Sequence, residues 1–291
     1  MTFEAFKEIE DNIKAIVSET LDAVKDKSFS DYCLLLARAG YQVELERESR
    51  APSPYVIDSR LENYQDRTRQ RFLLDYLNQY YRWLKDGVVF TPKNEEFNLN
   101  IQMMIYAQIW ESHFFLKTLK RIADILAGKP YVWQIKFANP AKSNPEKDKP
   151  ISRSKFINEQ ILSPLSRTKP PIYGVIEKAY DSDLRNAFAH SSYYIDMEGK
   201  VIASLNSERY SIDKEIHFCK WEKMFVQSVM LSYYISVQMQ KRVATFLDDY
   251  PDKKEVKVDW PSFIRPGNKR QIIIKPEKTP YGVEFSFKHN S

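Results

Sequence analysis

Apolar residues recur three and four positions apart over most of this chain, and that spacing constrains the fold more than any other feature. The longest such runs lie between about Asn98 and Ala127 and between Phe218 and Phe246, the second ending before Pro251. Only 7 of the 291 residues are glycine, and 14% are aromatic, a composition typical of long packed helices. The sequence therefore predicts a mainly α fold.

Three further helices are expected before residue 90. The first is marked by apolar residues from Phe6 to Val24, the second runs from Ser30 to Glu46, and the third runs from Leu61 to Lys85. Either Ser28 or Ser30 can cap the second helix. The Ala-Pro-Ser-Pro sequence at 51–54 stops it, since proline lacks an amide donor, and marks a first boundary.

Helical spacing resumes from Tyr173 to His190 and then gives way to period-two patterns. Residues 193–196 and 201–204 flank a loop in which Gly199 is expected to take a positive φ, so they predict a β-hairpin, and residues 210–216 are also expected to be extended. In the tail, alternating apolar residues predict three short antiparallel strands, around 256–260, 272–274 and 283–287.

These patterns divide the chain into three consecutive parts. We expect an N-terminal helical extension over 1–50, a helical domain over 55–250 and a C-terminal β tail over 251–291. Within the helical domain, 138–172 is expected to be a long loop, because 138–171 contains six prolines, five lysines and two arginines. A basic flap over a nucleic acid and a mobile solvated linker are both compatible with that composition.

Composition also excludes several classes of protein. Cys33 and Cys219 are too few for a disulfide scaffold or a cysteine-based zinc site, which favours a reducing compartment. No signal peptide or membrane-spanning run is visible, so a cytoplasmic protein with no membrane partner is expected. The histidines lack metal-site spacing, so no metal and no cofactor are predicted. A net charge of +5 favours an anionic partner.

The segment from Tyr180 to Tyr194 carries the residues best suited to chemistry. It places Arg185, Asn186 and His190 in a region of helical spacing, with Asn186 and His190 one turn apart. Histidine titrates near neutral pH and can move a proton from a ribose 2′-hydroxyl or to a leaving oxygen. Arginine is permanently charged and forked, which suits it to the charge on phosphate oxygens. The alternative is that Arg185 and His190 have only a structural role, in a polar seam between helices.

Cleavage of an RNA strand by attack of a 2′-hydroxyl benefits from a base on one side of the reacting phosphate and an acid on the other. One chain supplies a single His190, whereas a two-fold dimer would supply a second His190 and a second Arg185. We therefore expect a homodimer in which Arg185, Asn186 and His190 line an interface that opens to solvent along a basic groove.

The sequence Arg185-Asn186-Ala187-Phe188-Ala189-His190 resembles the signature of the HEPN superfamily, an Arg commonly followed by Asn, Asp or His, with a His four to six residues after the Arg. Three further features fit the family: the preceding leucine, the Ala-His-Ser that ends the motif, and the hairpin before a last long helix. The resemblance covers about Leu61 to Asp248. It implies an antiparallel helical bundle with a β-hairpin insert before the last long helix. The first two helices and the small C-terminal β element lie outside the resemblance.

The resemblance further implies a metal-independent endoribonuclease whose composite site forms across a homodimer, in a toxin-antitoxin or anti-phage defence role. An antitoxin or a defence-system protein would then be a further partner. Arg185 and His190 would be catalytic and Asn186 would support them, with Glu111 and Tyr193 as further supporting residues. Glu111 is chosen because some relatives hold the arginine with an acidic residue from a neighbouring helix. The competing expectation is a non-catalytic HEPN-like dimer that binds RNA, a nucleotide or a protein.

Basic residues outside the motif are candidates for contacts with the RNA backbone. Some lie on the third expected helix, some in the long loop and some at the first turn of the tail. Charge runs on helices are commonly just solvated faces, so that alternative stays open. The candidates are Arg67, Arg71, Lys142, Arg153, Lys269 and Arg270.

Overall fold

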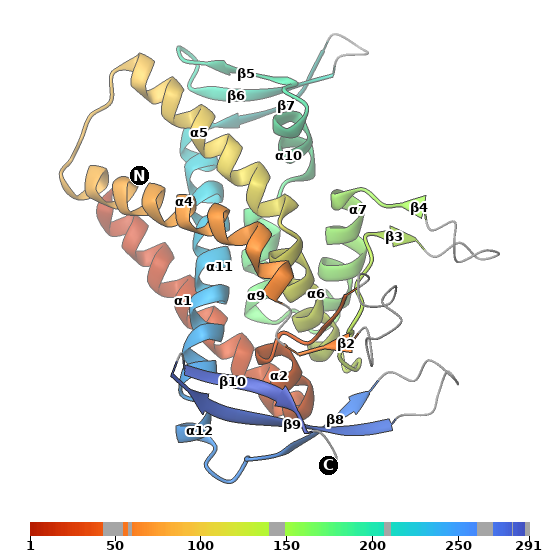
Figure 1. Ribbon diagram of the computed structural model, residues 1–291. Coiled ribbons are helices and arrows are strands. Elements are labelled where there is room, and N and C mark those ends of the chain that lie inside the picture. The colour runs from red at the N-terminus through yellow and green to blue at the C-terminus, as the bar shows by residue number, and fades with distance from the viewer. Residues whose placement is uncertain are drawn as a thin grey trace. The chain divides into compact units, whose positions relative to one another are not determined.

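A computed structural model shows a mainly helical protein with small antiparallel sheets (Figure 1). The structure describes residues 1–42, 55–57, 60–139, 149–206, 211–260, 270–280 and 282–288. Within these residues, no helix combines the length and the apolar character that crossing a bilayer requires. The expected mainly α fold with a C-terminal antiparallel sheet is confirmed at this level.

The longest helices lie where the apolar spacing predicts them. The N-terminal helix, the helix after residue 60 and the last long helix all match, and Ser28 caps the second helix by accepting a hydrogen bond from the amide of Asp31. The larger helices are α1 (Phe3–Lys27), α2 (Phe29–Leu36), α4 (Arg60–Lys85), α5 (Pro92–Glu111), α6 (His113–Leu126), α9 (Pro171–Ala179), α10 (Ser182–Ala189) and α11 (Phe218–Ala244), and the short helix α12 (Phe246–Asp249) follows α11.

Two predicted helices are divided and one is shorter than expected. The run from 98 to 127 breaks at Ser112, whose backbone is extended (ψ 119°) and whose hydroxyl accepts a hydrogen bond from the amide of Phe115, starting a new helix. The run from 173 to 190 breaks at 180–181 in the same way. The helix expected to reach Glu46 ends at Leu36, and the predicted boundary at 51–54 lies outside the described residues.

The hairpin after α10 is confirmed as β5 (Tyr193–Asp196) and β6 (Val201–Asn206), and β7 (Ser211–His217) adds the third strand in the order β5-β6-β7. The prediction of a positive φ at Gly199 is wrong, because the left-handed residue is Lys200 (φ 53°). Glycine at 199 instead leaves room for the side chain of Asp196. A Cβ there would lie 2.6 Å from Oδ2 of Asp196, whose other carboxylate oxygen accepts the turn amides.

The tail forms the expected three-stranded antiparallel sheet, with β9 (Arg270–Thr279) between β8 (Val256–Trp260) and the edge strand β10 (Gly282–Phe287). The long loop is partly structured, which corrects the expectation for 138–172. Residues 153–165 are helical throughout, because Ser152 caps the first turn and apolar side chains are buried beneath. The short elements are β1 (Gly40–Tyr41), β2 (Tyr55–Val56), β3 (Ala138–Asn139), β4 (Lys149–Pro150), α7 (Arg153–Ile157), the π-helical turn η2 (Asn158–Leu162) and α8 (Ser163–Leu165).

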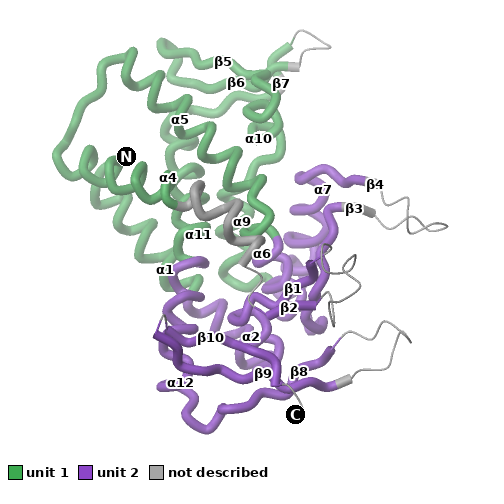
Figure 2. The backbone as a smooth tube through the Cα atoms, in the orientation of Figure 1, with its two compact units in different colours: residues 1–17, 65–116, 169–234 green, residues 18–64, 117–168, 235–291 purple. Residues whose placement is uncertain are grey.

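The chain divides into two compact units (Figure 2), and each is assembled from three separate stretches. Unit 1 consists of 1–17, 65–116 and 169–234, and unit 2 consists of 18–64, 117–168 and 235–291. The units therefore do not coincide with the three consecutive parts expected from the sequence, and α1, α6 and α11 each supply residues to both. The motif helix α10 belongs to unit 1, and the C-terminal sheet belongs to unit 2.

Unit 1 is built around a buried aromatic cluster. Trp110 and Tyr106 on α5 contact each other, and Tyr106 also contacts Trp221 on α11, with ring centroids 5.2 Å apart. The indole N–H of Trp221 donates to Gln102 at 2.9 Å, and that of Trp110 donates to Ser228 at 3.1 Å, so neither buried donor is left unsatisfied. Unit 2 has its own aromatic cluster, formed by Tyr55, Trp133, Trp260 and Phe287.

Candidate active site

The N-terminus of α10 is held by four contacts at Asp181. The Asp181 carboxylate caps the helix by accepting hydrogen bonds from the amides of Asp183 (3.1 Å) and Leu184 (3.0 Å). Its other oxygen forms an ion pair with Lys214 on β7, and its own amide donates to the hydroxyl of Tyr106 at 2.9 Å. The start of the motif helix is therefore fixed by residues of both α5 and β7.

The buried side of α10 rests on the aromatic cluster of unit 1. Phe188 contacts Trp221, Tyr106 and Tyr193, with centroid distances of 5.0, 5.9 and 5.4 Å. Aromatic pairs of this kind add about 0.5–1.5 kcal/mol each beyond the burial of their surface. Burial raises the pKa of Tyr106 well above its usual value, so this phenol stays protonated and serves as a hydrogen-bonding group.

Arg185 lies in the polar centre of the arrangement. Its guanidinium forms an ion pair with Glu111 at the C-terminus of α5, and Nη1 donates to Oδ1 of Asn186 at 2.7 Å. The residue is only 6% exposed, and its Nε is buried without a hydrogen-bond acceptor among the described residues. Burial lowers the pKa of Arg185, yet arginine stays charged because its ordinary pKa lies far above 7.

His190 lies at the end of the motif helix and not within it. It is the C-cap residue (φ −104°, ψ 5°), its amide donates to the carbonyl of Asn186 at 3.0 Å, and its side chain is exposed. In the described part of the chain the imidazole makes no hydrogen bond, and none joins it to Asn186 one turn earlier. The Asn186 amide oxygen instead accepts from Arg185.

Side-chain contacts thus join three of the five residues expected at the site, Glu111, Arg185 and Asn186. Glu111 pairs with Arg185 as anticipated, and the Tyr193 hydroxyl donates to Asn100 on α5 at 2.9 Å and so anchors the hairpin there. Asn186 and His190 are exposed, whereas Arg185 is buried, so the expectation that all three line a solvent-open groove is wrong for Arg185.

Of the six residues expected to contact RNA, the structure describes the side chains of Arg71 and Arg153. Arg71 is exposed on α4. Arg153 is half-buried with its guanidinium over the Phe137 ring, 3.8 Å from the centroid, so this residue is part of the packing of unit 2. The positions of Lys142 and Lys269 and the side chains of Arg67 and Arg270 lie outside the described residues.

Sequence reasoning missed Asp181, Lys214 and Tyr106 as residues that hold the motif helix. Asp181 could have been found, because aspartate one residue before an apolar-periodic segment is a helix-start signal. Tyr106 and Lys214 lie 75 and 33 residues from Asp181, and no local pattern joins residues at such distances.

The described residues contain no group of three His, Cys, Asp or Glu side chains placed to hold a metal ion. At α10 an exposed imidazole lies on the same helix as an amide and an arginine–glutamate pair. No protein-family model, no curated protein and no solved structure matches the chain.

Proposed function

We propose that this protein is a metal-independent endoribonuclease of the HEPN type that cleaves RNA by attack of a ribose 2′-hydroxyl on the adjacent phosphate. The observation that carries the proposal is the arrangement on α10, where the exposed imidazole of His190 follows a guanidinium that is held by Glu111 and Asn186. The segment from Arg185 to His190 resembles the HEPN motif, and that resemblance suggests the class of reaction.

In the proposed reaction, His190 removes the proton of the 2′-hydroxyl, whose oxygen then bonds to phosphorus. The bond between phosphorus and the 5′-oxygen breaks, and that oxygen takes a proton from a second acid, leaving a 2′,3′-cyclic phosphate and a 5′-hydroxyl. Arg185 stabilises the charge on the phosphate oxygens. Because Arg185 is paired with Glu111, in this proposal the phosphate displaces the partly exposed Glu111 carboxylate to reach the guanidinium.

A second copy of the chain would supply the second acid, and the outer face of α5 offers a surface for it. Phe97 and Met104 are seven residues apart, as are Met104 and Glu111, so the three share one face of the helix. Phe97 is 67% exposed and Met104 is 62% exposed, although both are large and apolar. In this proposal the two copies meet along that face, next to the Glu111–Arg185 pair.

A non-catalytic HEPN-like module that binds RNA, a nucleotide or a partner protein is the second candidate. The observation in its favour is the burial of Arg185, whose terminal nitrogens are engaged by Glu111 and Asn186 within one chain. Such a module would keep the arginine to fasten α5 to α10.

The deciding experiment incubates the protein with single-stranded and structured RNA in excess chelator. The nuclease proposal expects cleavage to 2′,3′-cyclic phosphate ends, lost at least about 100-fold in His190→Ala and in Arg185→Ala, the scale of general acid–base catalysis. His217→Ala is the matched control, because His217 is also an exposed histidine of unit 1 and should cleave normally. Cleavage that survives His190→Ala would refute the assigned site, and binding of RNA without cleavage would favour the module.

A further inference from the structure

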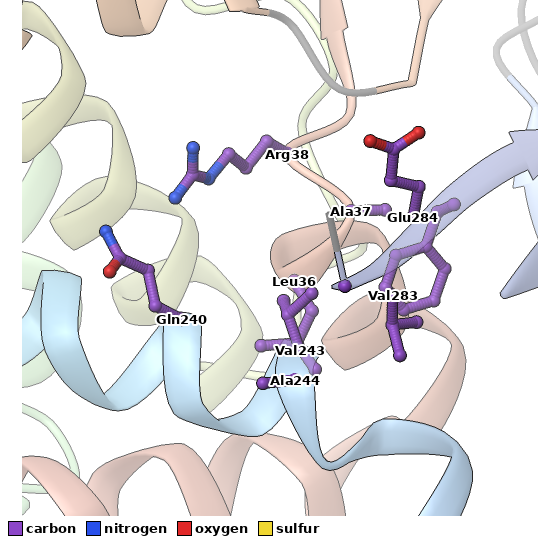
Figure 3. A pocket seen from close by; sticks show the side chains of 10 residues that line it. Leu36, Ala37, Arg38, Gln240, Val243, Ala244, Val283 and Glu284 are labelled. Atoms are coloured by element: carbon purple, nitrogen blue, oxygen red, sulfur yellow. The ribbon is translucent and has the colours of Figure 1, made fainter. Parts of the chain in front are cut away.

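Unit 2 contains a pocket of about 290 Å³ that has no part in the site on α10 (Figure 3). Three elements build it: the C-terminal end of α2, the last turns of α11 and the edge strand β10. Its apolar lining includes Leu36, Val243 and Val283, and its polar lining is Arg38, Gln240 and Glu284. That combination of an apolar floor and a few polar groups is typical of small-molecule sites.

The backbone at Arg38 is left-handed although the residue is not glycine. After the C-cap Ala37, the amide of Arg38 donates to the carbonyl of Leu35 (3.2 Å) and the amide of Ala39 donates to that of Leu34 (3.0 Å). This is the Schellman ending of a helix, in which the residue after the cap is left-handed and is usually glycine. Arg38 occupies that position with a φ of 49°.

A non-glycine residue in the left-handed region carries backbone strain, and such strain concentrates at functional sites. At this position the strained residue is also the one that brings a guanidinium to the pocket. Lys169, Ser191 and Lys200 share this conformation, so it is the place of Arg38 in the pocket lining that indicates a role for its side chain.

The charges in the lining define the ligand. In Figure 3 the guanidinium of Arg38 extends toward the side of α11, where Gln240 lies, whereas the carboxylate of Glu284 rises from β10 on the other side. An arginine fork fits a carboxylate, and the Gln240 amide can donate to the same group. Glu284 disfavours a ligand that is purely anionic and suits an ammonium group, while the floor suits an aliphatic chain.

We infer that this pocket binds a zwitterionic aliphatic amino acid, with its carboxylate on Arg38 and Gln240, its ammonium group toward Glu284 and its side chain over Val243 and Val283. A molecule with about nine heavy atoms suits a pocket of this volume. The inference is independent of the proposed ribonuclease activity.

Calorimetric titration of the full chain with L-leucine tests the inference, beside 4-methylpentanoate, which lacks the amine, and 3-methylbutylamine, which lacks the carboxylate. Leucine should bind, and each analogue should bind about tenfold more weakly or worse, because each lacks one charge-assisted contact. Absence of leucine binding at about 10 mM, on the order of the weakest specific affinities, would overturn the inference, as would an analogue that binds as well as leucine.

Arg38→Gly separates binding from folding. It removes the guanidinium, and glycine suits the left-handed backbone, so leucine binding should be lost while the thermal melt shows that the fold is intact. Lys169→Gly is the matched control, because Lys169 is an exposed non-glycine residue with a φ of 43° outside the pocket, and this variant should bind leucine normally. Unchanged leucine binding by Arg38→Gly would refute the assignment.

Glu284→Gln tests the ammonium side of the pocket. This variant should lose the preference for leucine over 4-methylpentanoate, because the carboxylate that selects the amine is gone while Arg38 remains. A preference that is unchanged from that of the natural chain would show that Glu284 does not contact the ligand and would overturn the zwitterion assignment.

Discussion

The carboxylate of Glu111 and the guanidinium of Arg185 form an ion pair that fastens the C-terminal end of α5 to the motif helix α10. Arg185 is buried, so losing Glu111 would leave its charge without an ionic partner, which costs more than at an exposed arginine. The pair therefore contributes to the stability of unit 1 whether or not the site is catalytic.

Glu111→Gln should lower the free energy of unfolding by about 1–2 kcal/mol, less than for a fully buried pair because Glu111 is 38% exposed. Urea denaturation measures the effect, with Glu96→Gln as the control because Glu96 is an exposed glutamate of the same helix. Equal unfolding midpoints for the two variants would contradict the assigned role of the ion pair.

Asp181→Ala should cost about 1 kcal/mol of stability, the usual effect of removing a helix N-cap. The substitution removes the acceptor for the amides of Asp183 and Leu184 and also the partner of Lys214. Thermal or urea unfolding reports the loss. Ser182→Ala, one residue later, should leave stability within about 0.5 kcal/mol, and a similar loss in both variants would show that the cap is not the cause.

Ser228→Ala should destabilise the protein by about 1–3 kcal/mol, because it leaves a buried donor and a buried acceptor without partners. The Ser228 hydroxyl accepts from the indole of Trp110 and donates to the carbonyl of Ala179 (2.9 Å) or Met224. Ser232→Ala on the same helix is the control for the change in helix propensity, measured by urea denaturation. A stability equal to that of Ser232→Ala would contradict the hydrogen-bonding role.

Asp22 should make unit 2 sensitive to acid. Hydrogen bonds from Arg242 (2.8 and 3.1 Å) hold the pKa of Asp22 below its usual value, and the charges of Arg242 and Lys25 act in the same direction. Because the folded-state pKa is lower than the unfolded value of about 3.9, the contribution is complete above that value and is lost as the pH falls through the folded pKa.

The stability difference between the natural chain and Asp22→Asn should therefore be constant at neutral pH and shrink below about pH 4. It should stay under about 1 kcal/mol, because the Asp22 side chain is 46% exposed and solvent screens the pair. Chemical denaturation at a series of pH values measures it, with Asp26→Asn as the exposed control. A difference that grows toward acid pH would reverse the assigned sign.

Met104→Glu should weaken self-association at least about tenfold if two copies meet along the outer face of α5, because it buries a charge in an apolar contact. Sedimentation velocity over a range of concentrations measures this, with the thermal melt showing that the fold is intact. Val89→Glu is the matched control, since Val89 is 92% exposed but lies off α5. Equal association of both variants would place any dimer contact elsewhere.

The sequence reveals the helices whose buried faces are long and periodic, such as α1, α4 and α11, because a repeated spacing averages over local exceptions. It does not reveal the break at Ser112, since serine is common both inside helices and at their caps. The pairing of Glu111 with Arg185 was anticipated through the resemblance to HEPN proteins, and the structure shows the contact. The burial of Arg185 was not anticipated, because it depends on packing between segments distant in sequence.

Helix α5, which ends at the break at Ser112, limits where residues can be inserted into or deleted from this protein. Each residue inserted in α5 rotates the remainder of that helix by about 100°, so one or two extra residues would carry Glu111 away from Arg185, and the strip of buried residues that ends at Trp110 would face solvent. Insertions of three or four residues nearly restore the original direction. Tolerated insertions and deletions should therefore avoid α5 or occur there in whole helical turns.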